Sequence, residues 1–124
     1  MMRRALFLIL IALFFSFNTH ARYTKTSKLK YKTDYSWSDY YTVDVIFMSG
    51  SELNRATKTF KYDSFTTYAI IFWKNDEATI IKISSFTGCG TEVNESCIIN
   101  KVTNLEGEDQ NGRGWEICTG KICF

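Results

Sequence analysis

Residues 67–84 read TYAIIFWKNDEATIIKIS, and this stretch decides the fold. The segment Thr67 to Trp73 is apolar on both faces, a pattern typical of a central strand that is covered on both sides. Lys74 to Glu77 is rich in the residues that form turns. The return segment, Ala78 to Ser84, alternates between two faces. The stretch therefore predicts an antiparallel β-hairpin built around a central strand.

Further strands are predicted on the N-terminal side of this hairpin. Residues 22–32 are basic and alternate weakly, which favours a first edge strand whose lysines discourage unwanted pairing. Residues 41–47 place valine and aromatic side chains on one face, as a half-buried strand does. Residues 57–62 resemble another strand. Between them, Ser49 and Glu52 have the spacing of a capping box for one helical turn, with a bulged loop as the alternative.

The C-terminal third is predicted to hold shorter strands separated by turns. A loop begins at 88–90, and Ile98 to Val102 is expected to form a short strand. Asn111-Gly112 is a signal for a two-residue hairpin leading into 115–118. The whole pattern predicts an all-β fold, a small antiparallel barrel or sandwich of six to seven short strands, held by disulfides in its C-terminal third.

The first 21 residues have the pattern of a cleaved secretory signal. Arg3 and Arg4 precede an apolar run from Ala5 to Phe17, and small residues lie at the −3 and −1 positions of a cleavage site after Ala21. The run is shorter than the roughly 20 residues that cross a bilayer. We therefore expect residues 1–21 to be removed, residues 22–124 to form a single β domain without a transmembrane segment, and the product to be periplasmic or secreted.

Removal of the signal changes the charge and the available chemistry. The chain holds 15 basic and 13 acidic residues and one histidine. Without Arg3, Arg4 and His20, the balance is 13 to 13 and no histidine remains. A Ser-His-Asp triad, a Cys-His pair and imidazole metal ligation are then excluded. We expect a protein that is not an enzyme and that has no catalytic residues, metal or cofactor.

All four cysteines lie in the last third of the chain. An even number in an exported chain predicts two disulfides, whereas a four-thiolate zinc site usually has shorter intervals. Local pairing would join Cys89 to Cys97 and Cys118 to Cys123. The crossed pairings remain open, because they close longer loops and would stabilise more.

Acidic residues of the C-terminal third could serve other chemistry. The loop 106–112 is rich in oxygen ligands, but it departs from the EF-hand pattern and is better interpreted as a solvated hairpin tip. Carboxylates could act as a general acid and base in a glycan hydrolase. The sequence alone does not place them in a cleft; the candidates are Glu106, Glu108, Asp109 and Glu116.

Two sets of residues are candidate binding surfaces. Aromatic residues in a loop often mark recognition surfaces, although they could instead cap an open barrel end. This set comprises Tyr35, Trp37, Tyr40 and Tyr41. A basic stretch could contact a polyanion such as lipopolysaccharide or anionic lipid, and outside the cytoplasm nucleic acid is not expected. This second set comprises Arg22, Lys25, Lys28, Lys30 and Lys32.

The segment FWKNDEATI at residues 72–80 resembles the corresponding hairpin of the bacterial envelope inhibitors of C-type lysozymes. Members of that family are small periplasmic β-barrels with a disulfide. The resemblance implies an exported β-barrel and, as an alternative function, a lysozyme-inhibitor-like or immunity-type role. The sequence departs from the family elsewhere, because Ser49-Gly50 lies too far upstream to match the family's serine-glycine inhibitory loop and lacks the pattern that follows it, and the extra cysteine pair of the C-terminal third has no counterpart. The main hypothesis is an exported, non-enzymatic binding module whose partner is a protein or an envelope polymer.

Overall fold

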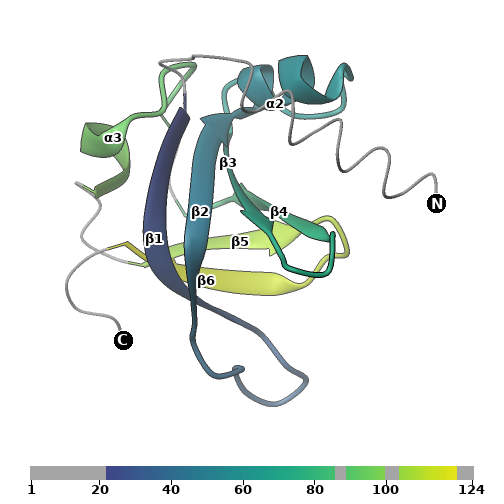
Figure 1. Cartoon of the computed structure of the whole chain (residues 1–124), viewed down its shortest axis with the longest axis vertical. Helices are drawn as coiled ribbons and strands as arrows, with labels where there is room; N and C mark the ends of the chain where they lie inside the picture. Colours follow the sequence, from purple (N-terminus) through teal and green to yellow (C-terminus); the bar gives the residue numbers. More distant parts are fainter. Residues whose placement is uncertain (1–21, 86–88, 100–103, 120–124) are drawn as a thin grey trace.

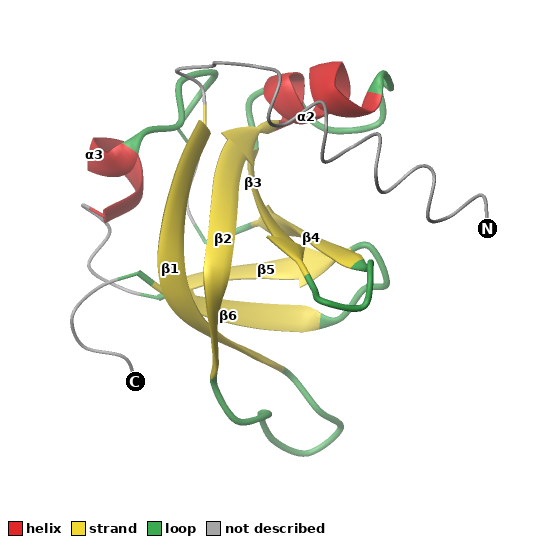
Figure 2. Cartoon of the chain, in the orientation of Figure 1, coloured by secondary structure: helices red, strands yellow, loops and turns green. Residues whose placement is uncertain are grey.

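The computed structural model describes residues 22–85, 89–99 and 104–119. Six antiparallel strands close into a barrel in the order β1-β2-β3-β4-β5-β6 (Figures 1 and 2). The strands are β1 (Arg22–Tyr31), β2 (Tyr41–Ser49), β3 (Thr67–Phe72), β4 (Ala78–Ile83), β5 (Leu105–Asp109) and β6 (Gly114–Cys118). The predicted all-β fold is confirmed, and the barrel is the correct one of its two alternatives.

Strand β1 is where the barrel closes. Along most of its length it pairs with β2, and its second half also pairs with β6, so that Leu29 lies opposite Ile117 and Tyr31 lies opposite Trp115. The prediction of an edge strand is therefore wrong, because both sides of this half of β1 carry hydrogen-bonded neighbours. Lys28 and Lys30, which lie in this half, therefore protect no open sheet edge.

The connections between strands separate into two groups at opposite ends of the barrel. In an antiparallel barrel of consecutive strands, alternate connections share one end. The β1–β2, β3–β4 and β5–β6 loops therefore lie together, at what we call the hairpin end. The other end, the helical end, carries the two short helices, α2 (Gly50–Thr57) after β2 and α3 (Glu95–Ile99) after β4 (Figure 1).

Strand β3 is buried on both of its faces, as its sequence indicates. One face contributes Ala69 and Ile71 to the barrel interior, where they join Phe47. The other face carries Tyr68 and Ile70, which form a second cluster with apolar residues of α2 and β2. The helix thus covers the outer side of the sheet, which explains why this strand has no polar face.

Helix α2 begins at a side-chain cap. The Ser49 hydroxyl accepts a hydrogen bond from the backbone N–H of Glu52 at 3.1 Å, and the Glu52 carboxylate contacts Arg55 at 3.6 Å. The helical interpretation of this segment is therefore confirmed. The helix extends to Thr57, and the strand predicted at 57–62 is wrong. The Asn54 side chain accepts from the backbone N–H of Tyr62 and donates to its carbonyl, which holds this segment in a loop.

Replacing Ser49 with alanine is expected to lower the free energy of unfolding by about 1 kcal/mol, because the buried first turn of α2 loses its cap. Urea denaturation followed by tryptophan fluorescence measures this loss. Ser64 is an exposed loop serine and provides the control, since Ser64→Ala removes a hydroxyl that caps no helix. Equal stability of the two variants would contradict the capping role.

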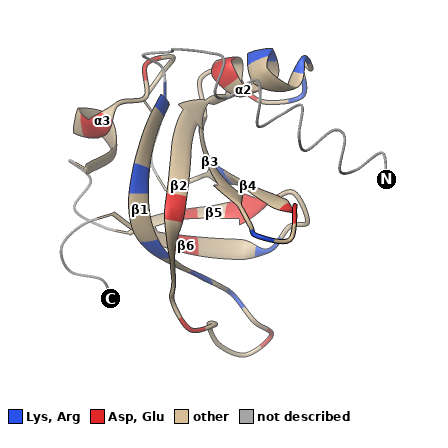
Figure 3. Cartoon of the chain, viewed as in Figure 1, with Lys and Arg blue, Asp and Glu red and all other residues tan. Residues whose placement is uncertain are grey.

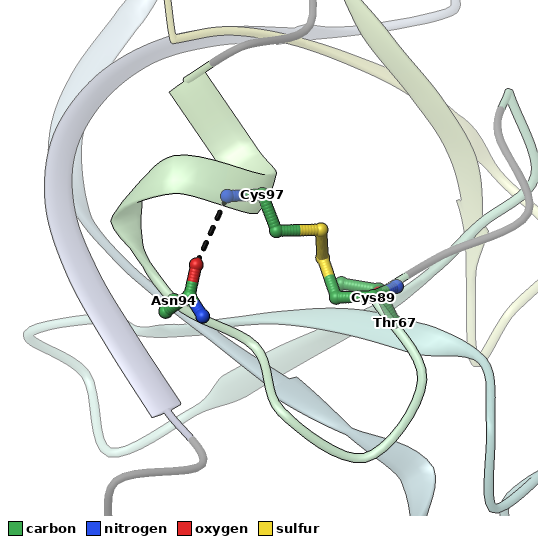
Figure 4. Close-up of a disulfide and its surroundings, with 4 residues drawn as sticks. All are labelled: Thr67, Cys89, Asn94 and Cys97. Carbon is green, nitrogen blue, oxygen red and sulfur yellow. Dashed lines mark hydrogen bonds between the residues drawn. A yellow bond between two sulfur atoms is a disulfide. The ribbon is translucent and has the colours of Figure 1, made fainter.

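A disulfide joins Cys89 to Cys97, with 5.9 Å between the two Cα atoms (Figure 4). Its two ends are held by hydrogen bonds. The backbone N–H of Cys97 donates to the Asn94 side-chain oxygen at 3.0 Å, and that of Cys89 donates to the Thr67 hydroxyl at 3.2 Å. The first predicted pairing is thus confirmed.

The remaining C-terminal predictions have mixed outcomes. Cys118 also takes part in a disulfide, while Cys123, its predicted partner, lies outside the described residues. Ile98 and Ile99 belong to α3, so the strand predicted at 98–102 is wrong for this part, and its other residues are outside the description. The helix forms here because the Asn94 side chain caps its first turn by accepting a hydrogen bond from the backbone N–H of Cys97, and because the disulfide fixes Cys97.

The predicted signal, residues 1–21, lies outside the described residues. Within the described ranges, no helix combines the length and the apolar character that a membrane crossing requires. The Cys89–Cys97 disulfide fits a chain that folds in an oxidising compartment.

Candidate binding site at the hairpin end

Four aromatic side chains meet at the hairpin end and form what we call the aromatic tetrad. Their ring centroids follow a closed cycle: Tyr31 to Trp115 at 5.4 Å, Trp115 to Trp73 at 6.4 Å, Trp73 to Tyr41 at 5.8 Å, and Tyr41 to Tyr31 at 6.1 Å. Two of the four contacts are edge-to-face, an arrangement that aromatic pairs favour. The four rings of the tetrad therefore cover the barrel interior at this end.

Polar contacts fix the orientation of the rings. The indole N–H of Trp115 donates to a carboxylate oxygen of Asp109 at 2.9 Å, and that of Trp73 donates to the Thr79 hydroxyl at 2.8 Å. The Arg113 guanidinium lies 4.6 Å from the centre of the Tyr31 ring, a cation–π distance. These contacts orient three of the four rings of the tetrad.

Asp109 also organises the β5–β6 turn. Its second carboxylate oxygen accepts from the backbone N–H groups of Asn111 and Arg113, at 2.9 and 3.0 Å. Gly112 has a φ of 81°, which glycine adopts without the strain that other residues meet. The loop spans four residues, 110–113, so the prediction of a two-residue hairpin at Asn111-Gly112 is wrong. The Asp109 carboxylate is occupied by N–H donors, which supports the hairpin-tip interpretation over a calcium loop.

Replacing Asp109 with alanine is expected to destabilise the fold by about 1–3 kcal/mol, because three N–H donors lose their acceptor and the indole of Trp115 is nearly buried. Chemical denaturation measures the change. Glu108 is the matched control, since it neighbours Asp109 in the chain and is exposed. A Glu108→Ala variant as unstable as Asp109→Ala would show that the acceptor role is not responsible.

The tetrad forms part of the lining of an open hollow of about 1590 Å³. Small-molecule sites usually enclose roughly 300–1,000 Å³, so this hollow is larger and shallower than such a site. Apolar atoms provide most of its surface, and charged groups of both signs are among its lining residues. The charged residues are Lys32, Lys74, Arg113, Asp34, Asp44, Glu77 and Asp109.

Tyr41 of the tetrad is a neutral hydrogen-bonding group. A hydrogen bond with the Tyr31 hydroxyl is the largest cause that raises the pKa of Tyr41 above its ordinary value of 10.0, and Arg113 opposes the shift. Because the shift is upward from an already alkaline value, Tyr41 keeps its proton at neutral pH. Tyr41 therefore contributes a ring and a neutral hydroxyl to the hollow.

The four aromatic residues singled out from the sequence separate in the structure. Tyr41 belongs to the tetrad, whereas Trp37 and Tyr40 lie with their ring centres 5.2 and 4.9 Å from the Lys30 amine. Tyr35 is fully exposed in the β1–β2 loop. Tyr41 thus helps to cap the end of the barrel, which was one of the two interpretations of this set. Trp37 and Tyr40 form a second, smaller surface around Lys30.

The five basic residues of the predicted polyanion surface do not gather at one place. Lys28 is exposed on the outer face of β1, and Lys30 approaches Glu116 at 3.8 Å. Lys25 lies opposite the buried Val45, on the other face of the strand. Arg22 lies at the helical end of β1 and Lys32 at the hairpin end, where it lines the hollow. Polyanion binding by this set stays a prediction.

The carboxylates considered for catalysis have structural contacts or face outward. Glu116 accepts a hydrogen bond from Asn104 at 2.8 Å, and Glu106 lies opposite it across the β5–β6 pair. Glu106 and Glu108 are exposed. Among the described residues, no three acidic, cysteine or histidine side chains are grouped closely enough to hold a metal ion.

Sequence reasoning did not find Trp73, Trp115 or Arg113 as site residues. A signal was present, because each lies within three residues of a predicted turn, Lys74 to Glu77 or Asn111-Gly112. In a barrel of consecutive strands those turns share one end with the β1–β2 loop. The sequence left a barrel and a sandwich open, and only the barrel brings Trp73, Trp115 and Arg113 together.

Comparison with protein-family models, with curated proteins and with solved structures finds no match to this chain. The fold and the site therefore define its class without reference to relatives. It is a small antiparallel β-barrel with a disulfide near its helical end and an aromatic hollow at its hairpin end.

Proposed function

We propose that this chain is an exported, non-enzymatic binding protein that holds a protein partner in the hollow at the hairpin end. The observation that carries the proposal is the aromatic tetrad with Arg113 beside it. Trp, Tyr and Arg are the residue types enriched at the energetic centres of protein interfaces. Here all three types lie together in one hollow, and charged residues surround it as a polar rim does.

The rigidity of the tetrad supports the same proposal. Binding costs free energy when side chains must be ordered at the interface. The indoles of Trp73 and Trp115 are already held by hydrogen bonds to Thr79 and Asp109. A partner would therefore meet rings that lose little conformational freedom. The open shape of the hollow suits a loop or segment of a protein better than an enclosed small molecule.

Export is the second component of the proposal. The predicted signal at residues 1–21 and the Cys89–Cys97 disulfide favour a periplasmic or secreted location. A partner is then expected among envelope or extracellular proteins. With no histidine after residue 21, a binding role agrees with the side-chain chemistry that remains in the exported chain.

Retention of envelope proteins on the immobilised, exported protein tests the proposal. Detergent-solubilised envelope extract should contain a partner that binds saturably and is released by free wild-type protein. Trp73→Ala is expected to weaken this binding at least tenfold, and Arg113→Ala, whose side chain is exposed, by several-fold. Phe60→Ala, which removes an exposed aromatic residue at the helical end, serves as the control.

Three outcomes of this experiment decide the proposal. A partner that is lost with Trp73→Ala and kept with Phe60→Ala supports it. Saturable binding that neither hollow variant changes would move the site elsewhere. If a polysaccharide is retained instead, and Trp73→Ala abolishes its binding, the hollow remains the binding site but the proposal of a protein partner is overturned.

One observation favours a narrower alternative, a lysozyme inhibitor. The segment Phe72 to Ile80, which resembles the hairpin of envelope lysozyme inhibitors, contributes Trp73, Lys74 and Thr79 to the hollow. Titrating the protein into a C-type lysozyme assay tests this role. Stoichiometric loss of lysozyme activity that Trp73→Ala relieves would support it, and full activity at excess protein would exclude it.

A further inference from the structure

The loop between α2 and β3, residues 58–66, exposes two phenylalanine side chains at the helical end. Phe60 is 98% exposed and Phe65 is 71% exposed. The tyrosine of the same loop, Tyr62, turns inward, and its ring centre lies 5.3 Å from that of Tyr68. The loop therefore half-buries its more polar aromatic residue and presents its two apolar ones to solvent.

Hydrogen bonds fix the backbone of this loop. The Asn54 side chain bonds both the N–H and the carbonyl of Tyr62, at 3.0 and 2.9 Å. The N–H of Asp63 donates to the Tyr68 hydroxyl at 3.0 Å, and the N–H of Gly50 donates to the carbonyl of Thr66 at 2.8 Å. The outward position of the two phenylalanines is thus a property of an ordered loop.

Positive charge accompanies the exposed rings. The acidic neighbours are already paired, Glu52 with Arg55 and Asp63 with Lys82. Within the described ranges, Lys58 and Lys61 form no ion pair, and basic segments lie on α2 and the turn after it (Figure 3). The Lys61 amine lies 5.2 Å from the centre of the Tyr62 ring, a contact that leaves its charge unneutralised.

Lys58 occupies an unusual backbone position. It caps the C-terminus of α2 with a φ of 56°, in the left-handed region where glycine is the usual residue. A charged side chain therefore stands at a position whose backbone conformation favours glycine. The loop thus combines an exposed lysine at the helix end with exposed phenylalanines on the segment that follows.

We propose that Phe60 and Phe65, together with Lys58 and Lys61, form a surface that docks onto an anionic lipid bilayer. Phenylalanine rings insert at the boundary between headgroups and acyl chains, and neighbouring lysines are attracted to anionic headgroups. The pairing of exposed rings with positive charge that no carboxylate neutralises matches these two components. Docking through the helical end leaves the hairpin end directed away from the bilayer, and it is independent of the partner proposed for the hollow.

Vesicle co-sedimentation of the exported protein tests this surface. The protein is mixed with vesicles of phosphatidylglycerol and phosphatidylcholine, or of phosphatidylcholine alone. We expect the protein to bind the anionic vesicles, and to bind vesicles of phosphatidylcholine alone at least tenfold more weakly. The double variant Phe60→Ser, Phe65→Ser should weaken it at least tenfold, and Lys58→Ser, Lys61→Ser should weaken it severalfold and reduce its dependence on salt.

Tyr35→Ser is the matched control, because Tyr35 is equally exposed but lies at the hairpin end. Its binding should equal that of wild type. Circular dichroism checks that the variants keep the fold. We expect them to do so, because the replaced side chains are exposed. Absence of binding to anionic vesicles, or binding unchanged by loss of both phenylalanines, would overturn the proposal. Self-association that depends on the phenylalanines, without vesicle binding, would overturn it too, because a second copy would then cover the surface.

Discussion

Gly107→Ala is expected to lower the free energy of unfolding by about 3 kcal/mol, the upper end of the usual effect of overpacking. A Cβ at this position of β5 would lie 2.2 Å from the carbonyl oxygen of Lys82 and 2.8 Å from a methyl carbon of Ile81. The nearest atom belongs to the backbone of the paired strand β4, so no rotamer change relieves the contact. The two strands would have to separate where Gly107 lies opposite Ile83.

Gly114→Ala provides the control for this prediction. Gly114 begins the neighbouring strand β6, and an added Cβ there would meet its nearest atom, in the Lys32 side chain, at 3.7 Å, an ordinary contact. We expect its stability to stay within about 0.5 kcal/mol of wild type, as for most surface substitutions. Urea denaturation of the two variants compares them directly. If both variants lose a similar amount of stability, the close approach of β4 and β5 does not restrict the side chain at position 107.

The double variant Cys89→Ser, Cys97→Ser is expected to lose about 2–3 kcal/mol of stability. The disulfide closes a loop with a sequence separation of 8, and chain entropy alone gives a loss of about this size. The loop also carries Val93, and α3 carries Ile98; both side chains are fully buried in the barrel core. Without the disulfide, these two core contacts depend on a loop that has lost its covalent crosslink.

Denaturation with and without reductant separates this disulfide from the one that contains Cys118. In oxidising conditions, the double variant should unfold at lower urea than wild type. Reductant should destabilise the wild type at least as much, because it breaks both disulfides, and should still affect the variant. A double variant as stable as oxidised wild type would contradict the role of this disulfide in holding α3.

Local sequence patterns predicted the parts of the fold that short-range physics determines. The alternation in residues 41–47, the turn residues at 74–77 and the Ser49 cap each act within a few residues, and each element is present. The strand predicted at 57–62 failed because Asn54, three residues before the end of α2, holds Tyr62 through its side chain. That contact is not visible in the alternation of the segment itself.

The aromatic site needed long-range information. Tyr41 could be proposed from the concentration of aromatic residues in one loop, but its partners Trp73 and Trp115 come from other hairpins. They meet because β6 returns to β1, which places Trp115 opposite Tyr31 across the closure of the barrel. No periodicity within a strand determines which strand lies beside it, so the sequence alone could not place these rings together.

The hydrogen exchange of the exported protein, free and bound to the partner recovered from the envelope, tests the binding site most directly. Binding in the hollow predicts slower exchange at the end of β1, in the 73–79 turn and in the 109–115 turn. The helical end, including residues 58–66, should exchange at an unchanged rate in detergent solution. Protection confined to the helical end or to the outer face of β1, with the three hairpin segments unaffected, would contradict the account.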